Sequence, residues 1–205
     1  MVKKMQQKII INVSNIRKHY GRQEILKGVT FSAGQGECVC ITGRNGCGKT
    51  TLLSILTGIE QCDSGTVQMP AGNVKIGYLP QINPLLERMS VKDNIKLWCN
   101  DKEEYERLVQ KYSLEEMLSK KVSHLSGGMK RRLALACAMA GNPTLLIMDE
   151  PTAALDVENK ALLHREMGKY AASGGTIIMV SHEKEEMDLA TSCYYMENGT
   201  LKRTK

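Results

Sequence analysis

Aromatic side chains and long apolar runs are both scarce in this sequence. Its 205 residues include seven Tyr, one Phe and one Trp, so aromatics make up 4% and the core must be mostly aliphatic and Met-filled. The longest stretch of low polarity covers residues 133–141, whereas a membrane-spanning helix needs about 20 predominantly apolar residues. The apolar run at residues 9–11 is also too short for a signal peptide. We therefore expect a chain that does not cross a membrane.

Paired cysteine motifs are missing as well. Seven cysteines occur, which is an odd number, and none forms a Cys-x-x-Cys pair. Several lie in apolar runs, as Cys38 and Cys40 do in a strand-like segment. We interpret them as reduced thiols of a cytosolic protein, and not as a disulfide framework or a zinc site.

The overall composition is typical of a soluble globular protein. Hydrophobic residues make up 42% of the chain and charged residues 24%, and the length suits one domain or one domain with a small inserted lobe. The net charge of +6 agrees with an anionic ligand or an anionic membrane surface. A moderately basic surface without such a partner would give the same charge, so charge alone assigns no function.

Hydrophobic periodicity predicts alternating strands and helices in the C-terminal half, which indicates a largely parallel sheet with helices on its faces. The first 80 residues are richer in strands and suggest an antiparallel flank. Expected strands cover residues 9–16, 29–32, 37–42, 65–68, 74–78, 145–149, 176–181, 192–197 and 200–202, with a hairpin turn at Asn198-Gly199. Expected helices cover residues 49–58, 91–98, 101–111, 114–118, 127–141, 158–172 and 183–190.

Residues 81–124 show no strand pattern, and Ser90 is placed to cap a helix within them. We interpret this segment as a small inserted helical lobe that extends into residues 125–141. The predicted fold class is α/β, with a core formed by residues 1–80 and 125–205. The whole chain, residues 1–205, is then a single domain.

A glycine-rich loop between an expected strand and an expected helix fits the P-loop pattern. Glycines let successive backbone N–H groups point at phosphate oxygens, and the helix adds the positive end of its dipole. The lysine can reach the β- and γ-phosphates, the first threonine can offer its hydroxyl to Mg²⁺, and the second threonine can reach the α-phosphate. The predicted nucleotide-binding residues are Gly43, Asn45, Gly46, Cys47, Gly48, Lys49, Thr50 and Thr51.

A P-loop alone does not distinguish an ATPase from a GTPase or a small-molecule kinase, and a plain glycine turn is the structural alternative. GTPases usually carry an Asn/Thr-Lys-x-Asp guanine motif, and this sequence has none. The remaining motifs therefore have to separate these classes.

Residues 125–156 read LSGGMKRRLALACAMAGNPTLLIMDEPTAALD. This stretch resembles the ABC ATPase family closely. Leu125-Ser126-Gly127-Gly128 is similar to the family signature, residues 145–149 to the Walker B strand, and Ala154-Leu155-Asp156 to the D-loop. Elsewhere, Tyr20, Gln81 and His182 resemble the adenine-stacking aromatic, the Q-loop glutamine and the switch histidine. All these elements occur in family order, so the resemblance implies a P-loop NTPase core.

The resemblance implies a role for each of these residues, and each has a plainer alternative. Asp149 would hold Mg²⁺, usually through water, but could be a turn residue. Glu150 would activate the attacking water, but could simply face solvent. Gln81 would reach Mg²⁺ or the water, His182 would contact the γ-phosphate or Glu150, and Tyr20 would stack on adenine. These three could instead be ordinary loop or packing residues.

The signature residues Ser126, Gly127 and Gly128 start a helix, where backbone N–H groups can bind an anion. In the family this segment completes the site of a second subunit, so that two chains enclose two ATP molecules and Asp156 lies near that site. A Ser N-cap followed by glycines is the alternative. We expect Lys130, Arg131 and Arg132 to form a mostly solvated helix face. Met129 stands where the family usually has Gln.

The resemblance implies an ATP- and Mg²⁺-dependent ATPase subunit that powers a membrane transporter. Its implied partners are transmembrane permease subunits on a separate chain and a second copy of itself or a related ATPase subunit. It would act in the cytoplasm, at the cytoplasmic face of the membrane, and the small chain slightly favours an exporter. A soluble ABC ATPase with an assembly or regulatory role remains open. A nucleic-acid-associated member would need coiled-coil arms or a second ATPase half, which this sequence lacks, so we expect no nucleic acid partner.

Overall fold

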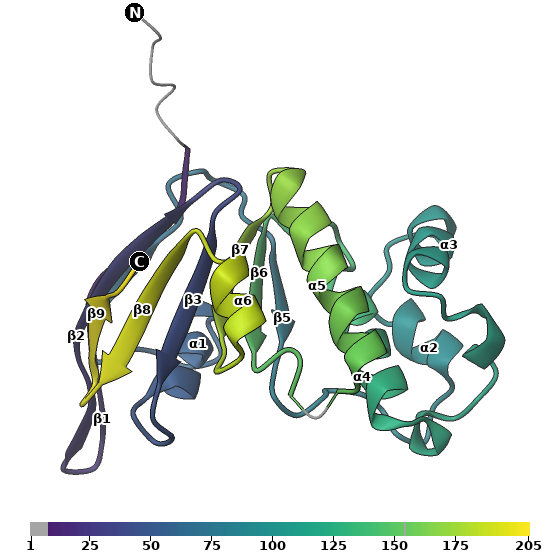
Figure 1. Cartoon of the computed structure of the whole chain (residues 1–205), viewed down its shortest axis with the longest axis horizontal. Helices are drawn as coiled ribbons and strands as arrows, with labels where there is room; N and C mark the ends of the chain where they lie inside the picture. Colours follow the sequence, from purple (N-terminus) through teal and green to yellow (C-terminus); the bar gives the residue numbers. More distant parts are fainter. Residues whose placement is uncertain (1–7, 154) are drawn as a thin grey trace, which may run out of the picture.

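Two β-sheets and a set of helices form the protein in the computed structural model, which describes residues 8–153 and 155–205 (Figure 1). Two parts of the chain lie outside the described residues: residues 1–7 and Ala154. The first belongs to the N-terminal stretch for which we predicted no signal peptide, and the second to the predicted D-loop. Within the described part, no helix combines the length and the apolar character needed to cross a membrane.

The smaller sheet is antiparallel, as expected for the N-terminal flank. Its order is β2-β1-β4, formed by β1 (Ile9–Tyr20), β2 (Gln23–Gly34) and β4 (Ser64–Gln68). The predicted strands at 9–16 and 29–32 were too short. The hairpin continues through polar pairs such as His19 with Glu24 and Tyr20 with Gln23. Because this end of the hairpin is largely exposed, its residues carry no apolar alternation that would reveal a strand.

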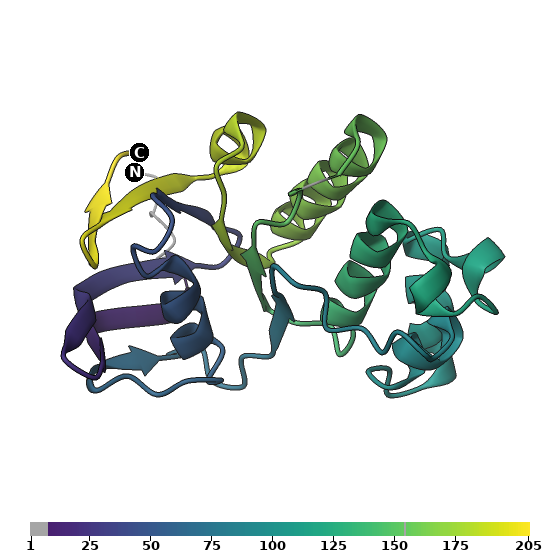
Figure 2. The same ribbon diagram turned by 90° about the horizontal axis from the view of Figure 1, so that it is seen from below.

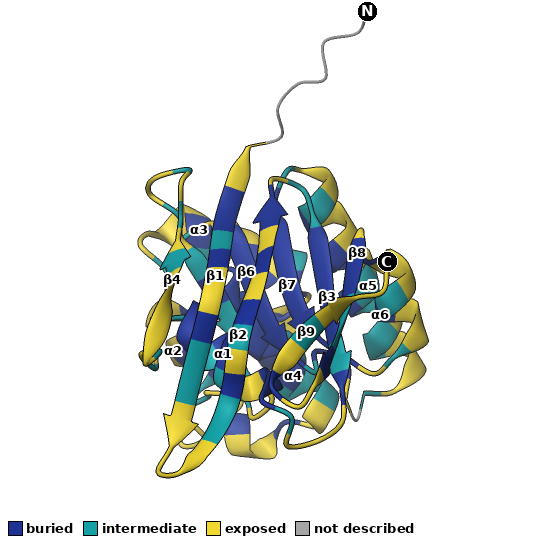
Figure 3. Cartoon of the chain, turned by 90° about the vertical axis from the view of Figure 1, so that its left-hand side faces the viewer, coloured by how far each residue is buried: buried dark blue, intermediate teal, exposed yellow. Residues whose placement is uncertain are grey.

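The larger sheet has the order β5-β6-β7-β3-β8-β9, and all its neighbouring strands are parallel except the β8–β9 hairpin. The central strands β6 and β7 are buried along their whole length, as Figure 3 shows, which fits parallel strands covered on both faces. The strands are β3 (Cys38–Gly43), β5 (Ile76–Leu79), β6 (Leu145–Asp149), β7 (Thr176–Val180), β8 (Ser192–Glu197) and β9 (Thr200–Arg203).

Helices α1 (Lys49–Leu56), α5 (Val157–Ala172) and α6 (Lys184–Leu189) connect or follow strands of the larger sheet. Helices α2, α3 and α4 gather at the end of the molecule opposite the antiparallel sheet (Figures 1 and 2). They span α2 (Val91–Lys96), α3 (Lys102–Lys111) and α4 (Gly127–Ala138), with 3-10 turns at Glu115–Met117 and Val122–His124.

The segment 81–124 is helical in its described structure, with Ser90 capping α2 by accepting a hydrogen bond from the Asp93 N–H. The helical segment expected at 114–118 is present, but as a 3-10 helix over Glu115–Met117 and not as an α-helix. The chain turns at Ser113, where φ is 50°, and Lys120 N–H bonds to Met117 O. These two turns leave room for only a single 3-10 turn. The division of the chain into a core and an inserted lobe stays a prediction.

Buried side chains form two clusters. One lies between the antiparallel sheet, α1 and one face of the larger sheet, and the other joins the opposite face of that sheet to α2, α3, α4 and α5. Both are rich in Ile, Leu and Val, and Met148, Met179 and Met196 are fully buried, so the expected aliphatic and Met-filled core is confirmed. All seven cysteines are free thiols.

Candidate functional site

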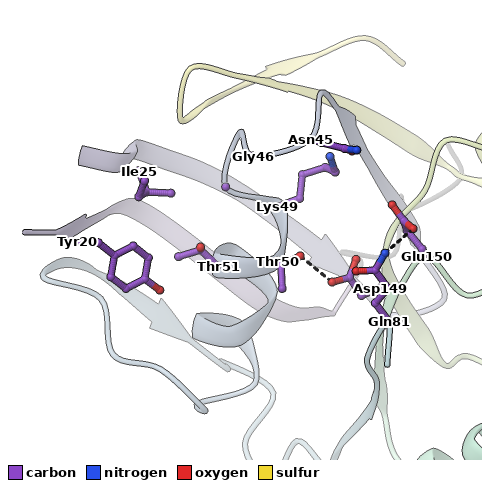
Figure 4. Close-up of a pocket in the computed structure, with 11 residues that line it drawn as sticks. Tyr20, Ile25, Asn45, Gly46, Lys49, Thr50, Thr51, Gln81, Asp149 and Glu150 are labelled. Carbon is purple, nitrogen blue, oxygen red and sulfur yellow. Dashed lines mark hydrogen bonds between the residues drawn. The ribbon is translucent and has the colours of Figure 1, made fainter. Parts of the chain in front are cut away.

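The carboxyl ends of four parallel strands meet at one edge of the larger sheet, where open α/β sheets bind their ligands. The P-loop follows β3, Gln81 follows β5, Glu150 follows β6 and His182 follows β7. A cavity of about 410 Å³ opens at this edge (Figure 4). Its lining residues are Tyr20, Ile25, Asn45, Gly46, Gly48, Lys49, Thr50, Thr51, Gln81, Asp149 and Glu150.

The P-loop takes its shape from glycine. Gly48 caps α1 with a left-handed φ of 108°, and a Cβ there would lie 2.9 Å from Leu26 Cδ2. A larger residue would therefore be both strained and crowded against the antiparallel sheet. Gly48 and the first residues of α1 line the cavity, so the N-terminal end of this helix is placed to bind an anion.

Lys49 supplies the positive charge of the cavity. Its side chain is only 7% exposed, and its Nζ donates hydrogen bonds to Gly43 O at 2.6 Å and to Arg44 O at 2.9 Å. These carbonyls hold the ammonium group against the loop, and Figure 4 shows the side chain crossing the centre of the cavity. A phosphate group in the cavity would therefore meet a cation that is already in place.

Asp149 and Thr50 form the oxygen-rich part of the cavity. Thr50 Oγ1 donates a hydrogen bond of 2.9 Å to Asp149 Oδ2. Asp149 is 2% exposed, and burial raises its pKa, while the hydrogen bond from Thr50 opposes that shift. A buried carboxylate beside a hydroxyl is a donor set that Mg²⁺ prefers, so the residues present fit this ion.

Glu150 lies directly after β6 and is held in an unusual backbone conformation. Its φ is 45°, a left-handed value that is uncommon for a residue other than glycine, and its N–H bonds to Val180 O at 2.9 Å. Gln81 Nε2 donates a hydrogen bond of 2.9 Å to Glu150 Oε2, and His182 Nε2 lies 4.0 Å from Glu150 Oε1. The side chains of Gln81 and His182 thus approach the carboxylate of Glu150.

Tyr20 lies at the other end of the cavity, far from Glu150 (Figure 4). Tyr20 is 51% exposed, and its hydroxyl donates a hydrogen bond of 2.6 Å to Glu60 Oε2. Lys18 Nζ lies 5.6 Å from the ring centroid. The ring is therefore fixed at its edge by Glu60 while remaining accessible to a planar ligand. Sequence patterns alone did not identify Glu60, because it follows α1 in a loop without a motif.

Two predicted P-loop residues, Gly43 and Cys47, do not line this cavity. Cys47 instead lines a neighbouring cavity of about 420 Å³, together with Lys27, Arg44 and the turn at residues 196–199. Gly43 lies beneath Cys47, since a Cβ at Gly43 would come 3.1 Å from the Cys47 Sγ.

The signature residues and Asp156 also lie away from the cavity. Ser126 caps α4, its Oγ accepting a 3.3 Å hydrogen bond from Met129 N–H. Asp156 caps α5 by accepting from Asn159 N–H at 2.8 Å. Gly128 packs against that cap, because a Cβ at this position would lie 2.5 Å from Asn159 Nδ2. Ser126 and Gly127 are exposed, so any ligand of this helix end must come from outside the chain's own cavity.

Arg131 was expected on a solvated helix face, and this expectation was wrong. The side chain is 4% exposed and donates hydrogen bonds to the chain segments that carry Gln81 and Glu150. Burial lowers the pKa of Arg131 to about 10, while the charge of Asp149 opposes the shift. Lys130 and Arg132 are partly exposed. The run of three basic residues gave no signal that the middle one points inward.

Comparisons with known proteins agree on one group. A family model described as ABC transporter matches residues 26–153. The Nod factor export ATP-binding protein I of Ralstonia nicotianae is 32% identical over 208 residues, which cover 93% of this chain and 65% of that protein. The aliphatic sulfonates import ATP-binding protein SsuB 1 of Shouchella clausii is 34% identical over 208 residues, covering 98% of this chain and 82% of that protein.

Solved structures give the same picture. The dimeric structure of a bacterial ABC transporter cassette superposes with a TM-score of 0.86 at 25% identity, covering 96% of this chain and 98% of that chain. The names of the relatives include both import and export systems. This chain spans 60 to 65% of the length of several of these relatives.

Proposed function

The chain belongs to the ABC transporter family, and on this premise we propose that it binds and hydrolyses ATP as the energy-supplying subunit of a transporter. The observation that carries the proposal is the single cavity that brings together Lys49, the Thr50–Asp149 pair and the Gln81–Glu150 pair. These groups supply a cation for phosphate, oxygen ligands for Mg²⁺ and a carboxylate for the attacking water.

Each group has a defined task in this proposal. The P-loop N–H groups and Lys49 bind the phosphates, and Thr51 contacts the α-phosphate. Thr50 and Asp149 hold Mg²⁺, which when bound neutralises charge on the phosphate oxygens. Tyr20 stacks on the adenine through its exposed ring.

Glu150 is the proposed general base. It accepts a proton from the attacking water, and the hydrogen bond from Gln81 orients the carboxylate. His182, 4.0 Å from Glu150, contacts the γ-phosphate or supports this carboxylate. The left-handed φ of Glu150 costs energy for a residue other than glycine, so the surrounding chain must stabilise this conformation.

The exposed helix end at Ser126, Gly127 and Gly128, with Asp156 nearby, is proposed to complete the ATP site of a second chain. Two observations support this arrangement: these residues are remote from the chain's own cavity, and the similar cassette was solved as a dimer. The second chain is a copy of this one or a related ATPase subunit.

An apolar groove supports the transporter part of the proposal. It has a volume of about 460 Å³ and lies between the end of β5 and helix α4, lined by Tyr78, Pro80, Trp98 and Ala134 among others. Trp98 is 55% exposed, and Ile82 beside Gln81 is 85% exposed. We propose that a short helix of a separate transmembrane subunit docks here, because an occupant of the groove would contact the segment that positions Gln81. Such docking would bring the chain to the cytoplasmic face of a membrane.

Two experiments test these parts separately. Purified protein should hydrolyse ATP with Mg²⁺, and Glu150→Gln should abolish turnover while ATP now yields a stable dimer; full activity of that variant would refute the role of Glu150.

For the transporter part, affinity purification from detergent-solubilised membranes should recover a polytopic membrane protein. A Trp98→Asp variant should lose it, whereas repeated recovery of soluble proteins alone would favour an assembly or regulatory role. Export is the finer proposal, supported by the export relative.

A further inference from the structure

Arg131 is a fully used hydrogen-bond donor in the interior of the protein. A guanidinium group has five N–H donors, and Arg131 directs bonds at five acceptors. Nε donates to Pro151 O at 2.8 Å, Nη1 to Pro80 O and to Asn83 Oδ1 at 3.0 Å, and Nη2 to Asp149 O at 2.9 Å and Glu150 O at 3.0 Å.

Four of these acceptors are backbone carbonyls, and none is a carboxylate. A simple ion pair would have used the acidic side chains nearby, whereas this arrangement fixes the course of the main chain. The bonds join segments that are distant in sequence, since Pro80 is 51 residues and Pro151 20 residues from Arg131. A buried guanidinium is costly unless its donors are satisfied. Because the carbonyls of both segments satisfy the donors of Arg131, its guanidinium holds the two segments together.

The two segments are those that carry the Gln81–Glu150 hydrogen bond. Pro80 immediately precedes Gln81, and the Glu150 carbonyl itself accepts from Nη2. The same group therefore holds the backbone on both sides of a 2.9 Å contact between side chains. It also holds Glu150 near its left-handed φ of 45°, which a free chain would leave.

Arg131 belongs to α4, the helix that begins with the exposed signature residues. Its guanidinium is thus a direct connection between that helix and the base of the candidate catalytic carboxylate. A shift of α4, when its N-terminal end meets a ligand of a second chain, would move the Pro80 and Glu150 carbonyls with it.

We propose that Arg131 is a positioning residue that sets the Gln81–Glu150 contact and couples it to the signature end of α4. This inference rests on the proposed ATPase function. Arg131 does not line the cavity, and it acts through the two residues it holds.

The first test separates turnover from binding. Arg131→Met keeps the length of the side chain and removes all five donors. We expect kcat to fall about tenfold or more, while the affinity for a fluorescent ATP analogue stays within about twofold, because the P-loop is untouched. Arg131→Lys, with three donors in place of five, should recover part of the lost kcat.

A matched control comes from Glu104, a second buried charged residue in the helical part. It is 6% exposed and accepts hydrogen bonds from Asn100 N–H, Asn100 Nδ2 and Gly141 N–H, all remote from the cavity. Glu104→Gln should lower the melting temperature but leave kcat per folded molecule unchanged. If Arg131→Met behaves like this control, Arg131 is merely structural and the proposal fails.

The second test asks whether Arg131 acts through Gln81. In a double-mutant cycle, Arg131→Met should reduce kcat by a clearly smaller factor in a Gln81→Ala background than in the wild type, because part of its effect acts through Gln81. Independent, additive losses would overturn the proposal. If Arg131→Met does not fold, the cycle can use Asn83→Ala, which removes one of the five acceptors of Arg131. The expected loss of kcat is then smaller, but it should depend on Gln81 in the same way. Absence of ATP hydrolysis in the wild type would instead reject the proposed function.

Discussion

Thr50 Oγ1 and Asp149 Oδ2 lie 2.9 Å apart although the two residues are 99 positions apart in the chain. The hydrogen bond joins the start of α1 to the end of β6 and thus the phosphate loop to the metal-binding carboxylate. Among the hydrogen bonds of the described residues, this is the only one that either side chain makes. An ion bound here would therefore replace this one bond with two contacts, one to each oxygen.

The first prediction concerns this pair. Asp149→Asn keeps the shape and can still accept from Thr50, but it removes the negative charge that a divalent ion needs. We expect Mg²⁺ to raise the melting temperature of the wild type in the presence of ATP and to have little effect on Asp149→Asn. Differential scanning fluorimetry with and without Mg²⁺ measures this. An equal Mg²⁺-dependent shift in both proteins would contradict the assignment of Asp149 as a metal ligand.

The second prediction concerns base stacking by Tyr20. Removing the ring in Tyr20→Ala should raise KM for ATP about tenfold, since stacking of a base on an aromatic ring contributes about 1–3 kcal/mol. The kcat should remain unchanged because the phosphates are bound elsewhere. Tyr20→Phe keeps the ring but loses the bond to Glu60, so a KM between those of wild type and Tyr20→Ala would show that Glu60 orients the ring. Unchanged KM in Tyr20→Ala would rule out stacking.

Motifs that directly follow strands could be predicted from the sequence, because the residue types and their spacing determine the local backbone structure there. The glycine spacing of the P-loop and the position of Asp149 at the end of an apolar run are visible in the sequence, so the sequence predicts both. Parallel topology then requires the ends of β3, β5 and β6 to meet. What the sequence did not contain was the path between these ends, such as the left-handed φ of Glu150.

Arg131 illustrates what could not be predicted. The stretch Lys130-Arg131-Arg132 reads as a charged helix surface, and Lys130 does pair with Glu87 at 2.9 Å. The burial of Arg131 is decided by carbonyl groups of two other segments, and a carbonyl is present at every residue. No residue type therefore marks its binding site. The polar end of the β1–β2 hairpin was missed for a related reason, because backbone pairing on an exposed edge needs no apolar pattern.

The third prediction concerns Cys47. Because its thiol lines the cavity beside the turn at residues 196–199, a maleimide should reach it from that side. Burial raises the pKa of Cys38 and of Cys40 to about 12, so these thiols should react slowly at neutral pH. Modification of Cys47 should inhibit ATP hydrolysis by displacing the P-loop, and Cys47→Ser should remain active. Mass spectrometry locates the label; unchanged inhibition of Cys47→Ser would show that another thiol is responsible.

The last prediction concerns the pH dependence of stability through Glu104. Burial alone would raise the pKa of this carboxyl, but hydrogen bonds from Asn100 and from Gly141 N–H outweigh it, so the pKa is lowered in the folded protein. A lowered pKa means that the folded state favours the ionised form, and the stabilisation is present above the ordinary pKa of Glu and lost as the pH falls through the folded value. At pH 7, Glu104→Gln should lower the free energy of unfolding by about 1–3 kcal/mol. The difference between wild type and variant should shrink as the pH drops below about 4. Urea unfolding of both proteins at pH 7 and below about pH 4 measures this difference in the free energy of unfolding. A difference that is constant with pH would show that the carboxylate charge contributes nothing.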